Sequence, residues 1–195
     1  MERHNDLPLF PLSQPLFPGI ALPLRIFEQR YLRLVREAVS RQSSFAIMPI
    51  VSGREVGERP EIYPWGTLVT IRDWQQRNDG LLGIVVAGER RVRIADIRAE
   101  DDGLLLANAE VLPEDPAQPV DDEDADLVDL LDKLATRLAL RDLVPKPELT
   151  VATLGWRLLT LLPFDNAWRF SQLAVDEPRQ RLRAIRDHLQ HLGGV

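Results

Sequence analysis

The chain has 195 residues, of which 45% are hydrophobic and 28% charged, a composition typical of a globular protein with a sizeable core rather than of a disordered one. Its formal charge of −6 argues against a sequence-independent nucleic-acid binder, because that class needs a basic footprint. The absence of cysteine excludes disulfides, thiolate catalysis and cysteine-ligated zinc.

The N-terminal segment combines prolines with large apolar side chains. They form the runs Leu7-Pro8-Leu9-Phe10-Pro11-Leu12, Leu16-Phe17-Pro18-Gly19 and Leu22-Pro23-Leu24-Arg25-Ile26-Phe27-Glu28-Gln29-Arg30-Tyr31. Because proline has no N–H, we expect short extended pieces and turns at a sheet edge, not central strands or helix interiors. Apolar residues at helical spacing then predict one helix between Glu28 and Arg41.

Short apolar or alternating runs, bounded by Gly, Asp and Asn, predict the strands that follow. The expected strands are Phe45–Val51, Thr67–Ile71, Leu81–Val86, Arg91–Ile97 and Leu104–Leu112. Many short strands with turn signals indicate a small closed or half-closed barrel. We therefore predict an α+β protein whose first subdomain, a β-rich barrel with one helix, spans residues 6–116.

The pattern changes after this barrel. In residues 113–126, prolines alternate with acidic residues up to Asp121–Asp124, which predicts a linker that leads into an acidic first helical turn. A leucine stripe predicts a helix from about Leu127, and further helices are expected over residues 148–162, after Asp165 and after Asp176. Residues 117–195 are thus expected to form an acidic linker and a helical bundle.

The proline-rich opening and the later run Val86-Ala87-Gly88-Glu89-Arg90-Arg91-Val92-Arg93-Ile94 resemble the N-terminal, substrate-binding domain of the ATP-dependent protease Lon (protease La). Arg25 and Gln29 stand where that family usually has His and Pro. The resemblance covers most of residues 6–112 clearly and the helical remainder loosely. It implies a barrel similar to the pseudouridine-synthase-associated (PUA) fold, followed by helices, in a stand-alone domain that recognises unfolded or tagged proteins.

Catalysis is not expected. The sequence has no Gly-x-x-x-x-Gly-Lys-Ser/Thr phosphate loop, and neither of its two lysines, Lys133 and Lys146, follows a glycine-rich loop or suggests a Ser-Lys peptidase pair. His188 and His191 lie three residues apart near a helix end, which makes a weak metal site. We predict no catalytic residue, no metal ion and no cofactor.

Aromatic residues near polar loops are the best candidates for a binding site. We predict that Tyr63, Trp65 and Trp74 contact apolar peptide segments, because aromatic side chains supply apolar area at low entropy cost. The alternative is that Tyr63 and Trp65 cover one end of the barrel. Glu28 is embedded in an apolar block and needs a cationic partner, for which we predict Arg91, with Arg90 as the second choice.

The function predicted from these features is a non-catalytic protein- or peptide-binding module that acts as an adaptor or regulator. Its expected partners are unfolded or tagged protein segments and a protease or chaperone. The alternative is an RNA-binding module, because several proteins of the PUA-like fold hold RNA, although the acidic balance opposes it. Met1–Asp6 is polar and no stretch approaches the roughly 20 apolar residues of a membrane helix, so a cytoplasmic location is expected.

Overall fold

The computed structural model describes residues 2–55, 57, 59–137 and 149–193. Contacts within the chain divide it into two compact units, Met1–Glu114 and Asp115–Val195. The boundary inferred from the sequence, after residue 116, lies in the same proline-rich linker and stays a prediction. Lys146 and the prolines on either side of it lie outside the described residues.

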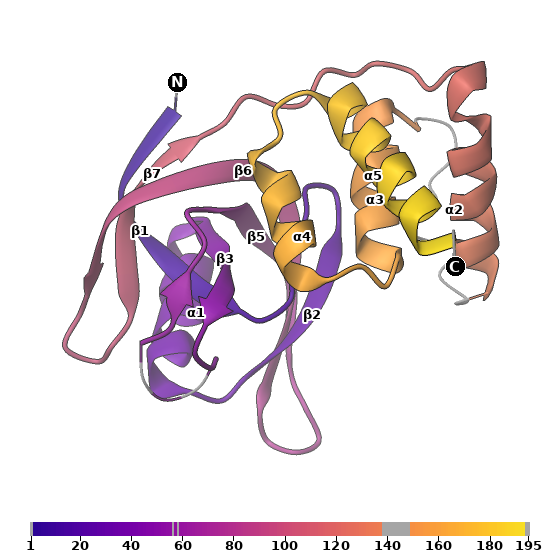
Figure 1. Ribbon diagram of the computed structural model, residues 1–195. Helices are drawn as coiled ribbons and strands as arrows, with labels where there is room; N and C mark the ends of the chain where they lie inside the picture. Colours follow the sequence, from indigo (N-terminus) through magenta and orange to yellow (C-terminus); the bar gives the residue numbers. More distant parts are fainter. Residues whose placement is uncertain (1, 56, 58, 138–148, 194–195) are drawn as a thin grey trace. The chain divides into compact units, whose positions relative to one another are not determined.

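The first unit is a closed barrel (Figure 1). Its elements are β1 (Glu2–Leu12), β2 (Ala21–Ile26), α1 (Gln29–Arg41), β3 (Phe45–Ser52), β4 (Glu61–Ile62), β5 (Trp65–Gln76), β6 (Leu82–Ala99) and β7 (Leu105–Val111). The strands pair in the order β1-β7-β6-β5-β3, and β1 also pairs with β3, so that five strands close into a ring. The β1–β3 pair is parallel and the other neighbours in the ring are antiparallel.

Alternation along the strands places one set of apolar side chains inside the barrel and a second set on its outer face. Leu9, Met48 and Val92 belong to the interior cluster. Phe10 and Phe45 instead meet outside it, where the ring of Phe10 lies 4.3 Å from that of Tyr31 on α1. Helix α1 therefore covers the outer face of β1 and β3, and the six residues of β3 from Phe45 to Ile50 are all buried. The predicted α+β class and the single inserted helix are confirmed.

The expectation that the N-terminal prolines mark a sheet edge is wrong for β1, because this strand pairs on both sides. It pairs with β7 between Glu2 and Leu9 and with β3 between Leu9 and Leu12. Pro8 falls in the part paired only with β7, and Pro11 in the part paired only with β3. At each proline one side of β1 has no strand partner, so the lack of an N–H on that side costs no ladder hydrogen bond. Proline is therefore compatible with a strand that closes the barrel.

The two strands expected at Leu81–Val86 and Arg91–Ile97 are one continuous strand, β6, of 18 residues. The segment between them remains extended because Arg90, Gly88 and Ala87 pair with Leu68, Val69 and Thr70 of β5. Gly88 also exchanges two backbone hydrogen bonds of 2.9 Å with Gly19 and Ile20. Gly88, which lies between the two expected strands, is a point where another backbone approaches closely.

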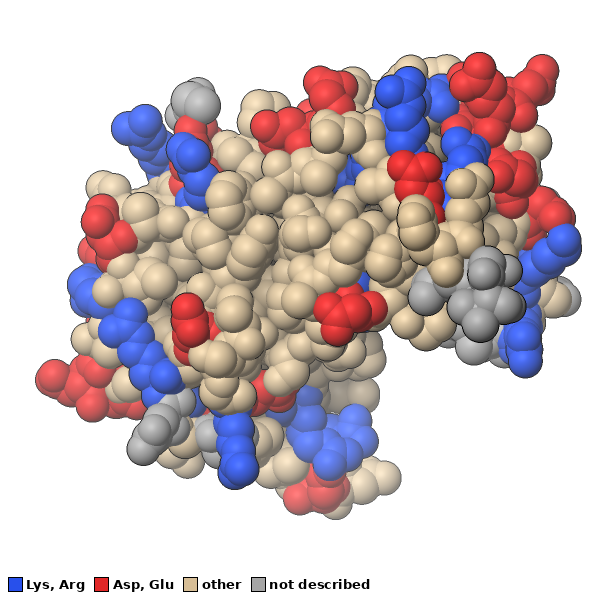
Figure 2. All heavy atoms as spheres, viewed as in Figure 1, with Lys and Arg blue, Asp and Glu red and all other residues tan. Residues whose placement is uncertain are grey.

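The second unit is helical. It contains the short 3-10 helices η1 (Asp122–Asp124) and η3 (Gln172–Ala174), and the α-helices α2 (Ala125–Arg137), α3 (Val151–Leu161), α4 (Asn166–Ser171) and α5 (Pro178–Gly193). Acidic side chains gather over η1 and the start of α2, at the upper right of Figure 2. There Asp121 caps η1, and Arg179 pairs with both Asp121 and Asp124. The acidic run thus begins a helix, as predicted, and two of its four carboxylates share one arginine of the same unit.

The core of the helical unit contains a fully buried arginine, Arg181. Its guanidinium lies 3.5 Å from the centre of the Trp156 ring and donates to Asp115 at 3.1 Å and to the carbonyl of Val175 at 2.8 Å. The indole N–H of Trp156 donates to the same carboxylate of Asp115 at 2.9 Å. A buried charge is tolerated here because it is paired and hydrogen-bonded.

The close approach at Gly88 gives a test of the barrel. A Cβ at this position would lie 2.3 Å from the carbonyl oxygen of Phe17, a backbone atom that cannot rotate away. We expect Gly88→Ala to lower the free energy of unfolding by about 1–3 kcal/mol, as overpacking does, measured by denaturant unfolding. Gly155→Ala is the matched control. Its Cβ would make only ordinary contacts, at 3.5 Å with Arg181 and Leu182 of α5, and alanine in the interior of helix α3 should raise stability. Equal stability of Gly88→Ala and the unmodified chain would contradict the packing described.

Candidate functional site

The aromatic residues predicted to form one contact patch lie at opposite ends of β5, where Trp65 begins the strand and Trp74 precedes its end. The rings of Tyr63 and Trp65 are 5.4 Å apart and both side chains are half-buried. Hydrogen bonds join their segment to the barrel, from Tyr63 N–H to the Pro49 carbonyl and from Ile94 N–H to the Pro64 carbonyl. Tyr63 and Trp65 are thus held against strands, and their role in peptide contact stays a prediction.

Trp74 lies in a different environment. Its segment, expected to be a loop, is part of strand β5 and pairs with Ile84 of β6. The Trp74 side chain is 59% exposed, which makes it the most exposed large hydrophobic residue in the described part of the chain. An exposed Trp is a candidate contact residue, because tryptophan is enriched at interfaces.

Trp74 separates two hollows that both lie against α1, and together they form what we call the Trp74 groove. One hollow, of about 390 Å³, is lined by Leu32, Val35, Arg36, Val39, Ser40, Trp74 and Leu82. The other, of about 570 Å³, is lined by Ala38, Val39, Gln42, Ser43, Thr70, Ile71, Arg72, Trp74 and Glu89. Trp74 and Val39 border both, so helix and strand present their exposed apolar residues to the same space.

The backbone of β5 beside this groove is shielded against pairing with another strand. Among the described residues, β3 pairs with β5 only from Thr67 to Val69, and the strand beyond carries a bulge between Ile71 and Asp73. The N–H of Trp74 donates to the carboxylate of Asp73 at 2.8 Å. Bulges and charged residues are common devices that protect strand edges. The groove therefore offers side-chain contacts rather than a free backbone edge.

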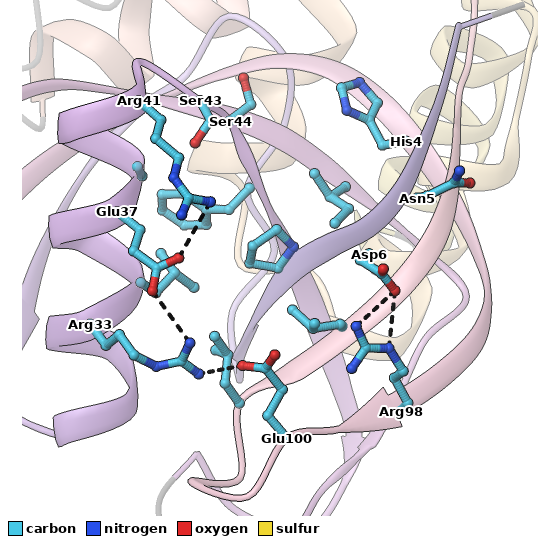
Figure 3. Close-up of a pocket in the computed structure, with 17 residues that line it drawn as sticks. His4, Asn5, Asp6, Arg33, Glu37, Arg41, Ser43, Ser44, Arg98 and Glu100 are labelled. Carbon is cyan, nitrogen blue, oxygen red and sulfur yellow. Dashed lines mark hydrogen bonds and ion pairs between the residues drawn. The ribbon is translucent and has the colours of Figure 1, made fainter.

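A second pocket, of about 400 Å³, lies on the other side of α1 and is polar (Figure 3). A bulge in β1 between His4 and Leu7 places Asp6 in the left-handed region, at φ 56°, where it pairs with Arg98. Glu37 pairs with Arg33 and Arg41 on α1. Each of these charged residues has a partner of opposite sign, so the pocket offers no uncompensated charge to a ligand.

Arg33 is the centre of this polar network. It reaches from α1 to the β6–β7 turn, where it contacts Glu100 at 2.5 Å and Asp102 at 2.8 Å. The hydrogen bond from Arg33 lowers the pKa of the Asp102 carboxyl and, in return, raises the pKa of Arg33. Arg30 adds a hydrogen bond to the carbonyl of Gly103 in the same turn. These contacts fix the N-terminal half of α1, one wall of the Trp74 groove.

Glu28, predicted to need a cation, pairs with Arg30 at 2.7 Å, and both side chains are largely buried. Arg91 is also buried, on β6 opposite Thr67. A contact between Glu28 and Arg91 stays a prediction.

The histidines of α5 have a structural setting. His188 stacks on Trp168 with ring centres 4.3 Å apart, and its edge meets Phe164 at 4.8 Å. The ring of His191 contacts the carbonyl of Asp187 at 2.6 Å. In the parts of the chain that the structure describes, no three His, Asp or Glu residues converge as metal ligands. Nor does any helix there have the length and apolar character needed to span a membrane.

Comparison with known proteins identifies the family. The sequence profile of the ATP-dependent protease La (LON) substrate-binding domain matches residues 6–191, nearly the whole chain. The chain belongs to the Lon substrate-binding domain family.

Solved structures support this assignment. The Lon N-terminal domain protein from Xanthomonas campestris superposes with a TM-score of 0.77 at 34% identity, over 96% of this chain and 98% of that one. The N-terminal domain of Mycobacterium avium complex Lon protease shares the fold, with a TM-score of 0.67 at 21% identity, over 93% and 96% of the two chains.

Curated relatives of the Lon domain are longer proteins. Cereblon from Danio rerio is 32% identical over 118 residues, which are 56% of this chain and 26% of that protein. Lon protease from Parabacteroides distasonis is 28% identical over 144 residues, which are 71% of this chain and 17% of that protein. The chain thus spans about a quarter or less of these relatives. Its 195 residues comprise the Lon substrate-binding domain and contain no ATPase or peptidase module.

The sequence suggests Trp74 but not the helix face that accompanies it in this Lon domain. Leu32 and Val39 lie on α1, far from Trp74 in the chain, and Leu82 begins β6, the second arm of its hairpin. The sequence contains a signal for this second face, because α1 has more apolar residues than the single stripe that contact with a core requires. In the structure, Val39 is the surplus residue that remains 38% exposed. What the sequence does not reveal is that this second apolar face lies opposite the β5–β6 hairpin.

The Arg33 network predicts a specific pH dependence. The pKa of Asp102 is lowered from 3.8 in the folded state, so its contribution to stability is complete above that value and is lost as pH falls through the lowered pKa. Thermal unfolding of the unmodified chain and Arg33→Met should differ by a constant amount at neutral pH and converge below about pH 4. Lys133→Met, which removes an exposed pair within α2, is the control and should change stability little. A difference that persists unchanged in acid would contradict this role.

The exposure of Trp74 can be measured directly. The chain has four tryptophans, of which Trp156 is buried and Trp65 and Trp168 are half-buried. We expect Trp74→Phe to shift the fluorescence maximum to shorter wavelength and to remove most of the quenching by acrylamide. Trp65→Phe should leave most of that quenching in place. Strong quenching that survives Trp74→Phe would show that the Trp74 side chain is covered.

Proposed function

We propose that this Lon substrate-binding domain is a non-catalytic module that binds exposed apolar segments of unfolded proteins in the Trp74 groove, as an adaptor or regulator for a protease or chaperone. The observation that carries the proposal is the exposed indole of Trp74, set between two hollows and faced by exposed apolar residues of α1. The family's description as a substrate-binding domain supports the same reading.

The energetics suit weak and adaptable binding. Covering the exposed part of Trp74 and Val39 removes roughly 100–150 Å² of apolar surface from water, which stabilises a complex by about 2.5–4 kcal/mol before the entropy of association is subtracted. A few such contacts per segment give reversible binding without sequence-specific hydrogen bonds. This is the behaviour needed by a protein that must accept many different unfolded chains.

Binding by side chains is favoured over addition of a strand. The bulge in β5 and the bond from the N–H of Trp74 to Asp73 leave this edge poorly suited to a continuous ladder. The hollow beside Leu32 and Leu82 is almost wholly apolar, with Arg36 as its single charged residue. We therefore propose that large apolar side chains of the bound segment enter the hollows on either side of the indole.

Fluorescence anisotropy of a labelled, permanently unfolded protein tests this function. Trp74→Ala should weaken binding about tenfold, as loss of a central aromatic contact does, without a change in melting temperature, since its side chain is largely exposed. Trp65→Ala is the matched control and should leave the affinity for the unfolded protein unchanged. Tyr63→Ala should also leave this affinity unchanged.

Two results would overturn the assignment. If Trp65→Ala weakens binding and Trp74→Ala does not, the site lies at the Tyr63–Trp65 end of β5. If a labelled single-stranded RNA binds in a strongly salt-dependent way and the unfolded protein does not, the module is an RNA binder.

A further inference from the structure

We propose that the Trp74 groove selects apolar segments that carry an acidic residue beside their apolar anchor. This inference rests on the proposed function, because it specifies the substrate class of the same groove. Its basis is a cation, Arg36, that lies in the wall of the apolar hollow and has no ion-pair partner in the described part of the chain.

Arg36 differs from its neighbours on α1. Arg33 and Arg41 both pair with Glu37, and Arg33 also pairs with Glu100. The side chain of Arg36 is exposed and, within residues 2–55, 57, 59–137 and 149–193, makes no ion pair or side-chain hydrogen bond. It is thus an uncompensated positive charge at the border of an otherwise apolar hollow.

The remaining charges around the groove do not cancel Arg36. In the second hollow, Arg72 pairs with Glu89 at 2.8 Å, which leaves that side neutral. Arg25 on β2 and Arg77 next to Trp74's strand share a single carboxylate, Asp79, each at 3.6 Å. None of these three residues lines either hollow, and Arg36 is the single charged residue that lines the apolar one. A lone cation in an apolar hollow, on a chain of formal charge −6, indicates complementarity to an acidic partner.

The position of Arg36 fixes the spacing of the acidic residue. Leu32, Arg36 and Val39 lie on one face of α1, and the distance from Leu32 to Val39 along the helix is about 10 Å at 1.5 Å per residue. An extended segment covers that distance in about three residues. A side chain anchored in the hollow thus places a carboxylate within reach of Arg36 when the acid is the next residue or the one after it.

Three labelled peptides of equal length test the inference. Each has the same central Leu-Phe pair, flanked on both sides by Asp, Ser or Lys, and binding is followed by fluorescence anisotropy at low and high salt. We expect affinity in the order Asp, Ser, Lys, with steps of about two- to fivefold, as single exposed charge pairs give. High salt should reduce these steps while the Ser peptide binds almost as before.

Charge reversal supplies the decisive comparison. Arg36→Glu should invert the order so that the Lys peptide binds most tightly, and because the Arg36 side chain is exposed the fold should be unaffected. Arg183→Glu is the matched control, since Arg183 is an exposed arginine in the interior of helix α5 with no ion pair among the described residues. It changes the net charge of the chain equally, so an equal response of both variants would show a general charge effect and overturn the inference.

The other outcomes are also distinct. Equal binding of the Asp and Lys peptides to the unmodified chain, with Trp74→Ala weakening both, would overturn the acidic preference and leave the proposed function intact. Binding of all three peptides that is indifferent to Trp74→Ala would overturn the function as well. Displacement of the Asp peptide by an oligonucleotide, at lower concentration than by unlabelled Asp peptide, would overturn the assignment to a peptide.

Discussion

Closure of the barrel by β1 is the constraint on which the rest of the first unit depends. This strand joins β7 to β3, and its parallel pairing with β3 completes the ring. The closure requires that Phe10 and Phe45 turn outward while Leu9 and Ala46 turn inward, because neighbouring side chains of a strand point to opposite faces. The outward aromatic residues then need a cover, which α1 provides through Tyr31. The position of α1, and with it the groove, follows from the closed ring.

Much of this architecture could be inferred from local patterns. The helix of residues 28–41, the helical second half, the acidic helix start at Asp121 and the cap at Asp165 each depend on residues close in sequence. The failures have a common origin in long-range pairing. Prolines in β1 suggest an edge, and the sequence pattern divides β6 into two strands, but both segments are strands whose neighbours come from elsewhere in the chain.

The candidate site shows the same limit more sharply. The residue type alone makes Trp74 a candidate contact residue. Its separation from Trp65 follows because both lie on one strand, and the sequence predicts only the Thr67–Ile71 part of that strand. The wall formed by Leu32 and Val39 depends on the packing of α1 beside a hairpin that begins more than one element later. Arg36 stands out as an unpaired arginine among the described residues only when the ion pairs of its neighbours are known. The sequence does not show those pairs, because some of them, such as Arg33 with Glu100, join residues far apart in the chain.

The length of β6 has a mechanical consequence. Eighteen residues would extend about 60 Å if straight, far more than the height of a small barrel. One part of β6 is therefore a barrel strand that pairs with β7. The other part is the hairpin arm that contains Ile84, the partner of Trp74. One wall of the groove is therefore continuous backbone with the barrel. The opposite wall, α1, is a separate segment tied to the β6–β7 turn chiefly by arginine side chains. The two walls are therefore held in different ways, one by the backbone ladder of a strand and the other by the side-chain contacts of a helix.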